Sequence, residues 1–82
     1  MYKNTRKYIR TTEREREILK NLTLTNKEIC EKFFLGMPSV KTYLHRLLKK
    51  FGVKNRIQLL VMALYLEEIT FDEVMENVIR NK

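Results

Sequence analysis

Several residue types are scarce in this sequence, and each shortage excludes a class of protein. Its 82 residues include one cysteine, one proline, two glycines and no tryptophan. A single cysteine cannot form an internal disulfide, so Cys30 is expected to be a packed thiol in a reducing compartment, the cytoplasm. So little glycine and proline, together with 44% hydrophobic residues, argues against disorder and favours a compact, mostly helical fold.

Long hydrophobic runs are also missing. The longest nearly apolar stretch, residues 57–66, is about half of what a bilayer span requires. The N-terminus is basic, but no apolar stretch follows it as in a secretory signal. We therefore expect no membrane association. At this length the chain should form one domain with a small core, without a separate catalytic or sensory domain.

The residues that build most catalytic and metal sites are equally rare. His45 is the only histidine, and with Cys30 it does not make a metal site by number or spacing. Ser39 has no candidate general base beside it, and no glycine-rich phosphate loop is present. We therefore expect no enzymatic activity, no metal and no cofactor.

Charge is abundant and unevenly distributed, with a formal net charge of +7. Residues 1–10 hold four bases and residues 41–56 hold six, and neither segment contains an acid. Residues 67–76 hold five acids and no base. This layout predicts one face for phosphates and another turned away from them.

Helix boundaries are marked by three capping boxes, in which a threonine is followed three residues later by a glutamate. They predict helices that begin at Thr12, Thr25 and Thr70. Within the second helix, Cys30, Phe33 and Phe34 follow Ile29 at helical spacing. The outer face of the first helix, residues 13–17, alternates acids and bases like a solvated helix surface.

A third helix is predicted after the short turn at residues 35–37, with Pro38 in its first turn and its end near Gly52. Apolar residues fall on one face: Val40, Leu44, Leu47, Leu48 and Phe51. Polar and basic residues fall on the other: Lys41, Thr42, His45, Arg46 and Lys49. Two short helices joined by a tight turn, the second with a basic face, suit a DNA major groove.

A fourth helix, capped by Asn55, is almost entirely apolar. Its predicted inward face is Ile57, Leu60, Ala63 and Leu64. The side chains left pointing away are Gln58, Val61, Met62 and Tyr65. Because a domain this small covers only one side of such a helix, we expect a homodimer through this outward face. Coverage by the last helix within the monomer is the alternative.

The last helix is predicted to carry one apolar stripe, made of Phe71, Val74, Met75, Val78 and Ile79. Its acidic surface is compatible with docking a basic partner, lengthening a dimer interface or capping the core. The sequence leaves these roles open.

Four segments, in this order and spacing, resemble the LuxR/GerE-type helix-turn-helix of bacterial regulators: residues 14–19, 26–29, 39–41 and 50–56. Among its members, the chain is most similar to the small standalone sporulation-type regulators. The resemblance implies an all-α fold, a four-helix LuxR-type domain at residues 11–66. A flexible basic arm at residues 1–10 and a helical extension at residues 67–82 flank it.

The resemblance also implies functional residues. The third helix enters the major groove, with DNA contacts from Lys41, Thr42, His45 and Lys49, and the fourth helix forms the dimer. Thr25, Asn26 and Lys27, at the start of the second helix, hold a phosphate with the help of the helix dipole. Ser39 supports the helix start or a phosphate, and sequence-independent attraction to phosphates is expected from Arg46, Lys49, Lys50, Lys54 and the arm.

The chain departs from the family pattern at three places. The loop after the first helix is shorter, Gly36 replaces the usual capping serine, and Tyr43 stands where histidine is frequent. These differences bear on base preference rather than on the fold.

Two alternatives compete with this interpretation. Residues 40–46 also resemble the recognition helix of sigma-factor region 4, which implies promoter or RNA polymerase binding. A protein-interaction module acting through the acidic last helix is the other. The favoured hypothesis is a cytoplasmic, nucleoid-associated regulator that binds double-stranded DNA sequence-specifically as a dimer.

Overall fold

The computed structural model describes residues 9–80, and in this range the chain forms five helices and no strand. They are α1 (Glu13–Lys20), α2 (Asn26–Phe33), α3 (Met37–Phe51), α4 (Arg56–Tyr65) and α5 (Phe71–Arg80). The all-α fold predicted from the sequence is confirmed. Most of the predicted basic arm, residues 1–8, lies outside the described residues, as do residues 81 and 82.

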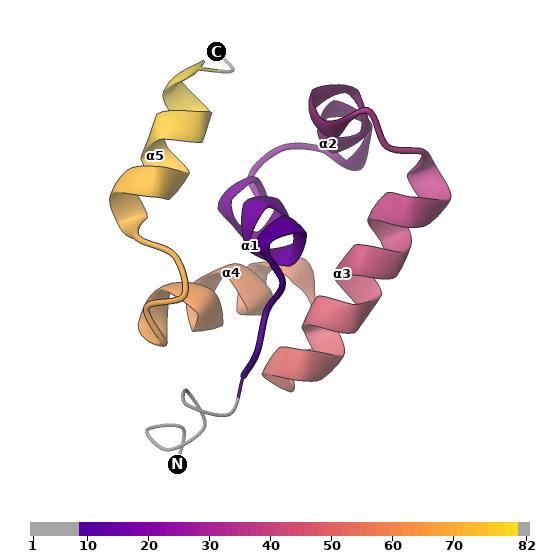
Figure 1. Ribbon diagram of the computed structural model, residues 1–82. Coiled ribbons are helices and arrows are strands. Elements are labelled where there is room, and N and C mark those ends of the chain that lie inside the picture. The colour runs from indigo at the N-terminus through magenta and orange to yellow at the C-terminus, as the bar shows by residue number, and fades with distance from the viewer. Residues whose placement is uncertain (1–8, 81–82) are drawn as a thin grey trace.

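The helices are arranged around α1, which lies in the middle of the molecule with α3 on one side and α5 on the other (Figure 1). Helices α2 and α3 pack on each other as the helix-turn-helix, and α3 also packs on α1 and α4. Helix α5 packs on α1. The basic helix and the acidic helix are therefore separated by the body of the domain.

All three capping boxes form as predicted. The Thr12 N–H donates to Glu15 Oε1 at 2.9 Å, and the Glu15 N–H donates back to Thr12 Oγ1 at 3.1 Å. Thr25 with Glu28 and Thr70 with Glu73 make the same reciprocal pair. Asn55 caps α4 by accepting from the Gln58 N–H, and Gly52 ends α3 with a positive φ of 66°. Local sequence therefore sets most of the helix ends.

The turn between α2 and α3 differs from the prediction at Phe34. Helical spacing places this residue on the apolar face of α2, but the helix ends at Phe33. Phe34 adopts a left-handed backbone with φ 56°, and its side chain is 94% exposed. Leu35 packs against the core instead, because the left-handed residue reverses the chain direction.

The core is formed by apolar residues from all five helices and from the connections between them. Ile69 and Val74, which lie beyond the helix-turn-helix, are as much part of this cluster as the helices before them. The other members are Ile18, Leu19, Leu22, Leu24, Ile29, Val40, Leu47, Phe51, Leu59, Ala63 and Leu66. The last helix thus completes the domain. No helix within residues 9–80 is long and apolar enough to cross a membrane.

Glu15 is not part of a solvated helix surface, and this prediction is wrong. Its side chain is buried, and Lys50 Nζ donates to Glu15 Oε1 at 2.7 Å and to the Arg10 carbonyl at 2.8 Å. Burial raises the pKa of the Glu15 carboxyl, but the bonds from Lys50 and the Thr12 backbone outweigh it, so the pKa is lowered. Lys50, which was expected to attract phosphates, ties α3 to the start of α1 through these two bonds.

The predicted inward face of α4 is also partly wrong. Leu59 and Ala63 are the buried residues of this helix, whereas Ile57 is 74% exposed. Leu60 and Leu64 are half-buried against the core. At the first position of the helix, Arg56 turns inward and hydrogen-bonds the connection between α1 and α2.

The apolar stripe predicted for α5 is narrower in the structure. Val74 is buried, and Met75 and Val78 are half-buried, but Phe71 and Ile79 are 64% and 61% exposed. The main packing partner of α5 is α1, so only one strip of the α5 surface meets the core.

Candidate nucleic-acid interface

Helix α3 presents the polar and basic residues predicted to contact DNA to the solvent. Val40, Leu47 and Phe51 are buried and fix the rotation of the helix about its axis. The candidate contacts are then all exposed: Ser39, Lys41, Thr42, His45, Arg46 and Lys49. The structure brings these six residues together along one surface, as the helical spacing predicts.

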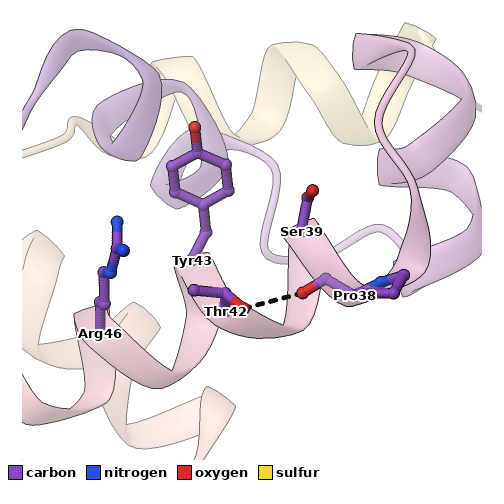
Figure 2. Close-up of a pocket in the computed structure, with 5 residues that line it drawn as sticks. All are labelled: Pro38, Ser39, Thr42, Tyr43 and Arg46. Carbon is purple, nitrogen blue, oxygen red and sulfur yellow. Dashed lines mark hydrogen bonds between the residues drawn. The ribbon is translucent and has the colours of Figure 1, made fainter.

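Thr42 is distinguished from its neighbours by an internal hydrogen bond. Its Oγ1 donates to the Pro38 carbonyl one turn earlier, at 2.9 Å (Figure 2). The hydroxyl proton is therefore used within the helix. What Thr42 offers outward is a methyl group and an oxygen that accepts, which suits a thymine methyl or a base amino group.

The cations on α3 are largely free of internal partners. Within residues 9–80, Lys41, Arg46 and Lys49 take part in none of the ion pairs, whereas Lys50 is paired with Glu15. An exposed cluster of cations without acids attracts polyanions through its field.

The start of α2 supplies a second set of candidate contacts. Thr25 and Lys27 are exposed, and the capping box occupies the N–H groups of Thr25 and Glu28. The first-turn N–H groups of Asn26 and Lys27 point out of the helix end, where the dipole favours an anion. The Asn26 side chain is half-buried, and its Oδ1 accepts from Arg56, so that oxygen is engaged within the domain.

Arg56 has a structural role. It is one of the six bases counted in residues 41–56, but its side chain is half-buried rather than exposed. Its guanidinium donates to the carbonyls of Leu22 and Leu24 and to the Asn26 side chain. Burial lowers the pKa of this guanidinium. It thereby joins the start of α4 to the loop before α2 and holds the N-terminus of α2 in place. A single arginine followed by an apolar helix was the only sequence signal for this role.

Lys54 lies in the connection between α3 and α4 and is exposed. Its N–H donates to Gln58 Oε1 at 2.9 Å, so the Gln58 side chain folds back over the start of α4. Lys54 also lines the surface hollow beside the outward face of α4.

The outward face of α4 is apolar and open. Val61 and Tyr65 are 59% and 65% exposed, Gln58 is exposed and Met62 is half-buried. A surface hollow of about 470 Å³ adjoins it, lined by Gly52, Val53, Lys54, Ile57, Gln58, Val61 and Met62. Ile57, predicted to face inward, joins this face. Helix α5 does not cover it, because α5 lies against α1.

Polar contacts hold α5 in that position. Lys20 Nζ lies 3.2 Å from Glu73 Oε2, and Asn77 Nδ2 donates to the Lys20 carbonyl at 2.8 Å. Lys32 Nζ on α2 donates to Asn77 Oδ1 at 3.0 Å and to Asn21 Oδ1 at 2.8 Å. These bonds connect α5 with both α1 and α2.

No group of three or more histidine, cysteine, aspartate or glutamate side chains in residues 9–80 is placed to hold a metal ion. Cys30 is a half-buried thiol on α2.

Comparisons with known proteins identify the family of this domain. Residues 11–63 match the family model of bacterial regulatory proteins of the LuxR family. The uncharacterized transcriptional regulatory protein YxjL of Bacillus subtilis is 40% identical over 55 residues, 65% of this chain and 25% of YxjL. The DNA-binding transcriptional activator DevR/DosR of Mycobacterium tuberculosis is 44% identical over 54 residues, 63% of this chain and 25% of its own.

A third relative is the CsgBAC operon transcriptional regulatory protein of Escherichia coli, 47% identical over 49 residues, 57% of this chain and 23% of its own. The chain thus spans about a quarter of the length of these curated relatives. No solved structure matches it.

Proposed function

Because the chain belongs to the LuxR family of bacterial regulatory proteins, we propose that it is a sequence-specific regulator of transcription that binds double-stranded DNA as a dimer. In this proposal α3 enters the major groove and reads base edges, and Lys41, Thr42, His45 and Lys49 contact the DNA there. The observation that carries it is the exposed face of α3, where Lys41, Arg46 and Lys49 form no ion pair with any described residue.

The N-terminus of α2 holds a backbone phosphate beside the groove. Lys27 is exposed there, and the first-turn N–H groups of α2 supply donors with the positive end of the helix dipole. Arg56 positions this helix end through Asn26 and the two loop carbonyls. Lys49 and Lys54 add sequence-independent attraction further along α3.

Dimerisation occurs through the outward face of α4. Ile57, Val61 and Tyr65 form an exposed apolar stripe at i, i+4 and i+8, flanked by Gln58 and Met62. A two-fold contact between such stripes places two α3 helices on one side of the dimer. The expected operator is then roughly palindromic, with half-sites about 10 base pairs apart from centre to centre.

The direct test is a fluorescence-anisotropy titration of labelled DNA duplexes. A random pool is titrated first, and then the sequences that the protein selects from that pool. Binding that weakens steeply between about 50 and 200 mM salt is expected, because the phosphate contacts release counterions. A well-folded protein without salt-dependent binding would contradict the proposal.

The dimer is tested separately by sedimentation of Val61→Asp. The charged residue should yield a monomer that loses most of its affinity for the enriched duplex. Ile79→Asp is the matched control, since Ile79 is equally exposed but lies on α5. Equal effects of the two substitutions on oligomeric state would argue against the α4 interface.

A further inference from the structure

A hollow on one flank of α3 is not explained by base reading. It measures about 300 Å³ and is lined by Pro38, Ser39, Thr42, Tyr43 and Arg46, all from this one helix. Figure 2 shows the side chains of Ser39, Tyr43 and Arg46 projecting from the same side of α3. The lining contains no carboxylate.

The three projecting side chains share one chemical property, which is that each donates hydrogen bonds. Ser39 and Tyr43 are hydroxyl donors, and Arg46 is a permanent cation with a planar set of N–H groups. The hydroxyl of Thr42, the remaining polar lining residue, already donates a hydrogen bond to the Pro38 carbonyl. Several hydrogen-bond donors around a hollow that has no carboxylate in its lining suit an anion with several oxygens.

The spacing of these residues allows them to act on one group. Ser39 and Tyr43 are four residues apart, and Tyr43 and Arg46 are three apart, so each pair is adjacent on the helix surface, with Cβ atoms about 5–6 Å apart. Ser39 also lies in the first turn of α3, where the helix dipole favours negative charge.

The position of the hollow argues for DNA backbone. At 100° per residue, Tyr43 and Arg46 lie beside the face centred on Thr42 and Lys49. A helix with side chains is about 10–12 Å across and the major groove about 12 Å wide, so the flanks of α3 meet the phosphate walls. Tyr43 is half-buried against the core, which holds its ring in place at the edge of the hollow.

The neighbouring charges leave Arg46 available. Lys50, the next cation on this flank, is bound to Glu15 at 2.7 Å, so Glu15 is already paired. Arg46 forms no ion pair within residues 9–80. Its charge acts on Glu15 at longer range and helps to lower the pKa of that carboxyl, but its guanidinium forms no hydrogen bond within residues 9–80.

We infer that Ser39, Tyr43 and Arg46 bind a backbone phosphodiester of the DNA and thereby set the depth and angle at which α3 enters the groove. This inference rests on the proposed function and extends it to Tyr43, which stands where the related domains often have histidine. Tyr43 acts here as a neutral donor to phosphate and Arg46 as its charged partner.

The first test separates the two donors by the salt dependence of DNA affinity, measured for each variant on the same set of duplexes. Tyr43→Phe keeps the ring and removes only the hydroxyl, so affinity should fall about three- to tenfold on every duplex, without a change in salt slope. Arg46→Ala should weaken binding about tenfold or more and lower the slope by about one, because one counterion fewer is released. Arg80→Ala, which removes an exposed cation on α5, is the matched control and should change neither.

The second test places a neutral methylphosphonate at successive positions of the enriched duplex. One position should weaken the wild type but have no further effect on Arg46→Ala, since both changes remove the same contact. Unchanged thermal melting of Tyr43→Phe excludes a loss of fold as the cause.

The outcomes distinguish this inference from the proposed function. If the wild type binds no DNA, both fail. If the wild type binds and Lys41→Ala weakens it, but the Tyr43 and Arg46 variants bind normally, only the phosphate hollow is overturned. Losses confined to one sequence would make these residues base contacts, and saturation by inorganic phosphate alone would make the hollow a free-anion site; either result overturns the inference.

Discussion

Helices α3 and α5 pack on the same central helix from opposite sides, and they use their charges in opposite ways (Figure 1). The acid Glu73 on α5 is paired with Lys20 of α1, and Glu68 just before it is paired with Arg16. On α3, Lys41, Arg46 and Lys49 have no such partner within residues 9–80. Charges that the fold itself satisfies stabilise the domain, whereas charges left open are available to a ligand.

The two helices differ in what they add to the core as well. Helix α3 buries Val40, Leu47 and Phe51 and carries the structural contacts of the helix-turn-helix. The α5 segment adds Ile69 and Val74 at the other end of the same cluster. Removing either side therefore affects stability, but only the α3 side should affect DNA recognition directly.

The largest effect is expected from Ile69→Ala. Ile69 is 2% exposed, and truncation of a buried isoleucine costs about 2–5 kcal/mol, from lost burial and the cavity that remains. We expect the free energy of unfolding to fall by this amount, measured by chemical denaturation. At a temperature where the variant stays folded, DNA affinity should change little. A large loss of affinity in the folded variant would mean that α5 contributes to binding.

A smaller effect is expected from Lys41→Ala on α3, and it should reduce DNA affinity rather than stability. If Lys41 contacts a guanine, binding to the enriched site should lose about 1–3 kcal/mol, and preference at that position should relax. Because Lys41 is exposed and unpaired, the free energy of unfolding should be nearly unchanged. Titration against matched and scrambled duplexes measures the difference; an equal loss on both would assign Lys41 to a phosphate.

The connection between the two sides can be tested through pH. The pKa of Glu15 is lowered in the folded protein, so its contribution to stability is present above the unfolded value of about 4.3. That contribution is lost as the pH falls through the lower folded value. The free energy of unfolding, measured across this pH range, should fall less in Glu15→Gln than in the wild type. The glutamine keeps the cap but loses the charge, which should cost about 1 kcal/mol at neutral pH.

The smallest effect is expected from Glu73→Gln. The Lys20–Glu73 pair is about one-third exposed on each side, so solvent screens it and its loss should cost about 0.2–1 kcal/mol. The capping role remains, because glutamine also accepts from the Thr70 N–H. Thermal melting in low and high salt should show that the difference from wild type shrinks with salt. A loss as large as that of Ile69→Ala would mean that the pair, rather than the core, holds α5 in place.

Much of the fold was predictable because the signals are local. Thr12, Thr25 and Thr70 each have a glutamate three residues on, and a capping box needs no tertiary partner. The exposed face of α3 was predictable for the same reason, since helical spacing separates Lys41 and His45 from Val40 and Leu47.

The misassigned residues depend on contacts between distant segments. Glu15 is buried because Lys50 reaches it from 35 positions away, and Arg56 is satisfied by the loop that contains Leu22 and Leu24. Inside α4, nearly uniform apolar composition gives no preferred face, so periodicity could not reveal that Ile57 points outward. The hollow beside Tyr43 likewise combines a half-buried ring with exposed donors.

The sequence by itself determined that this protein is an all-α domain with capped helices, a basic third helix and the pattern of the LuxR family. Spacing along one helix and hydrogen bonds within a few residues are sufficient for these features. Only the tertiary structure decided which cations remain open, which face of α4 is free and that α5 rests on α1. Those outcomes depend on which distant side chains satisfy each other's charge and cover each other's apolar surface, and the order of residues along the chain does not specify that directly.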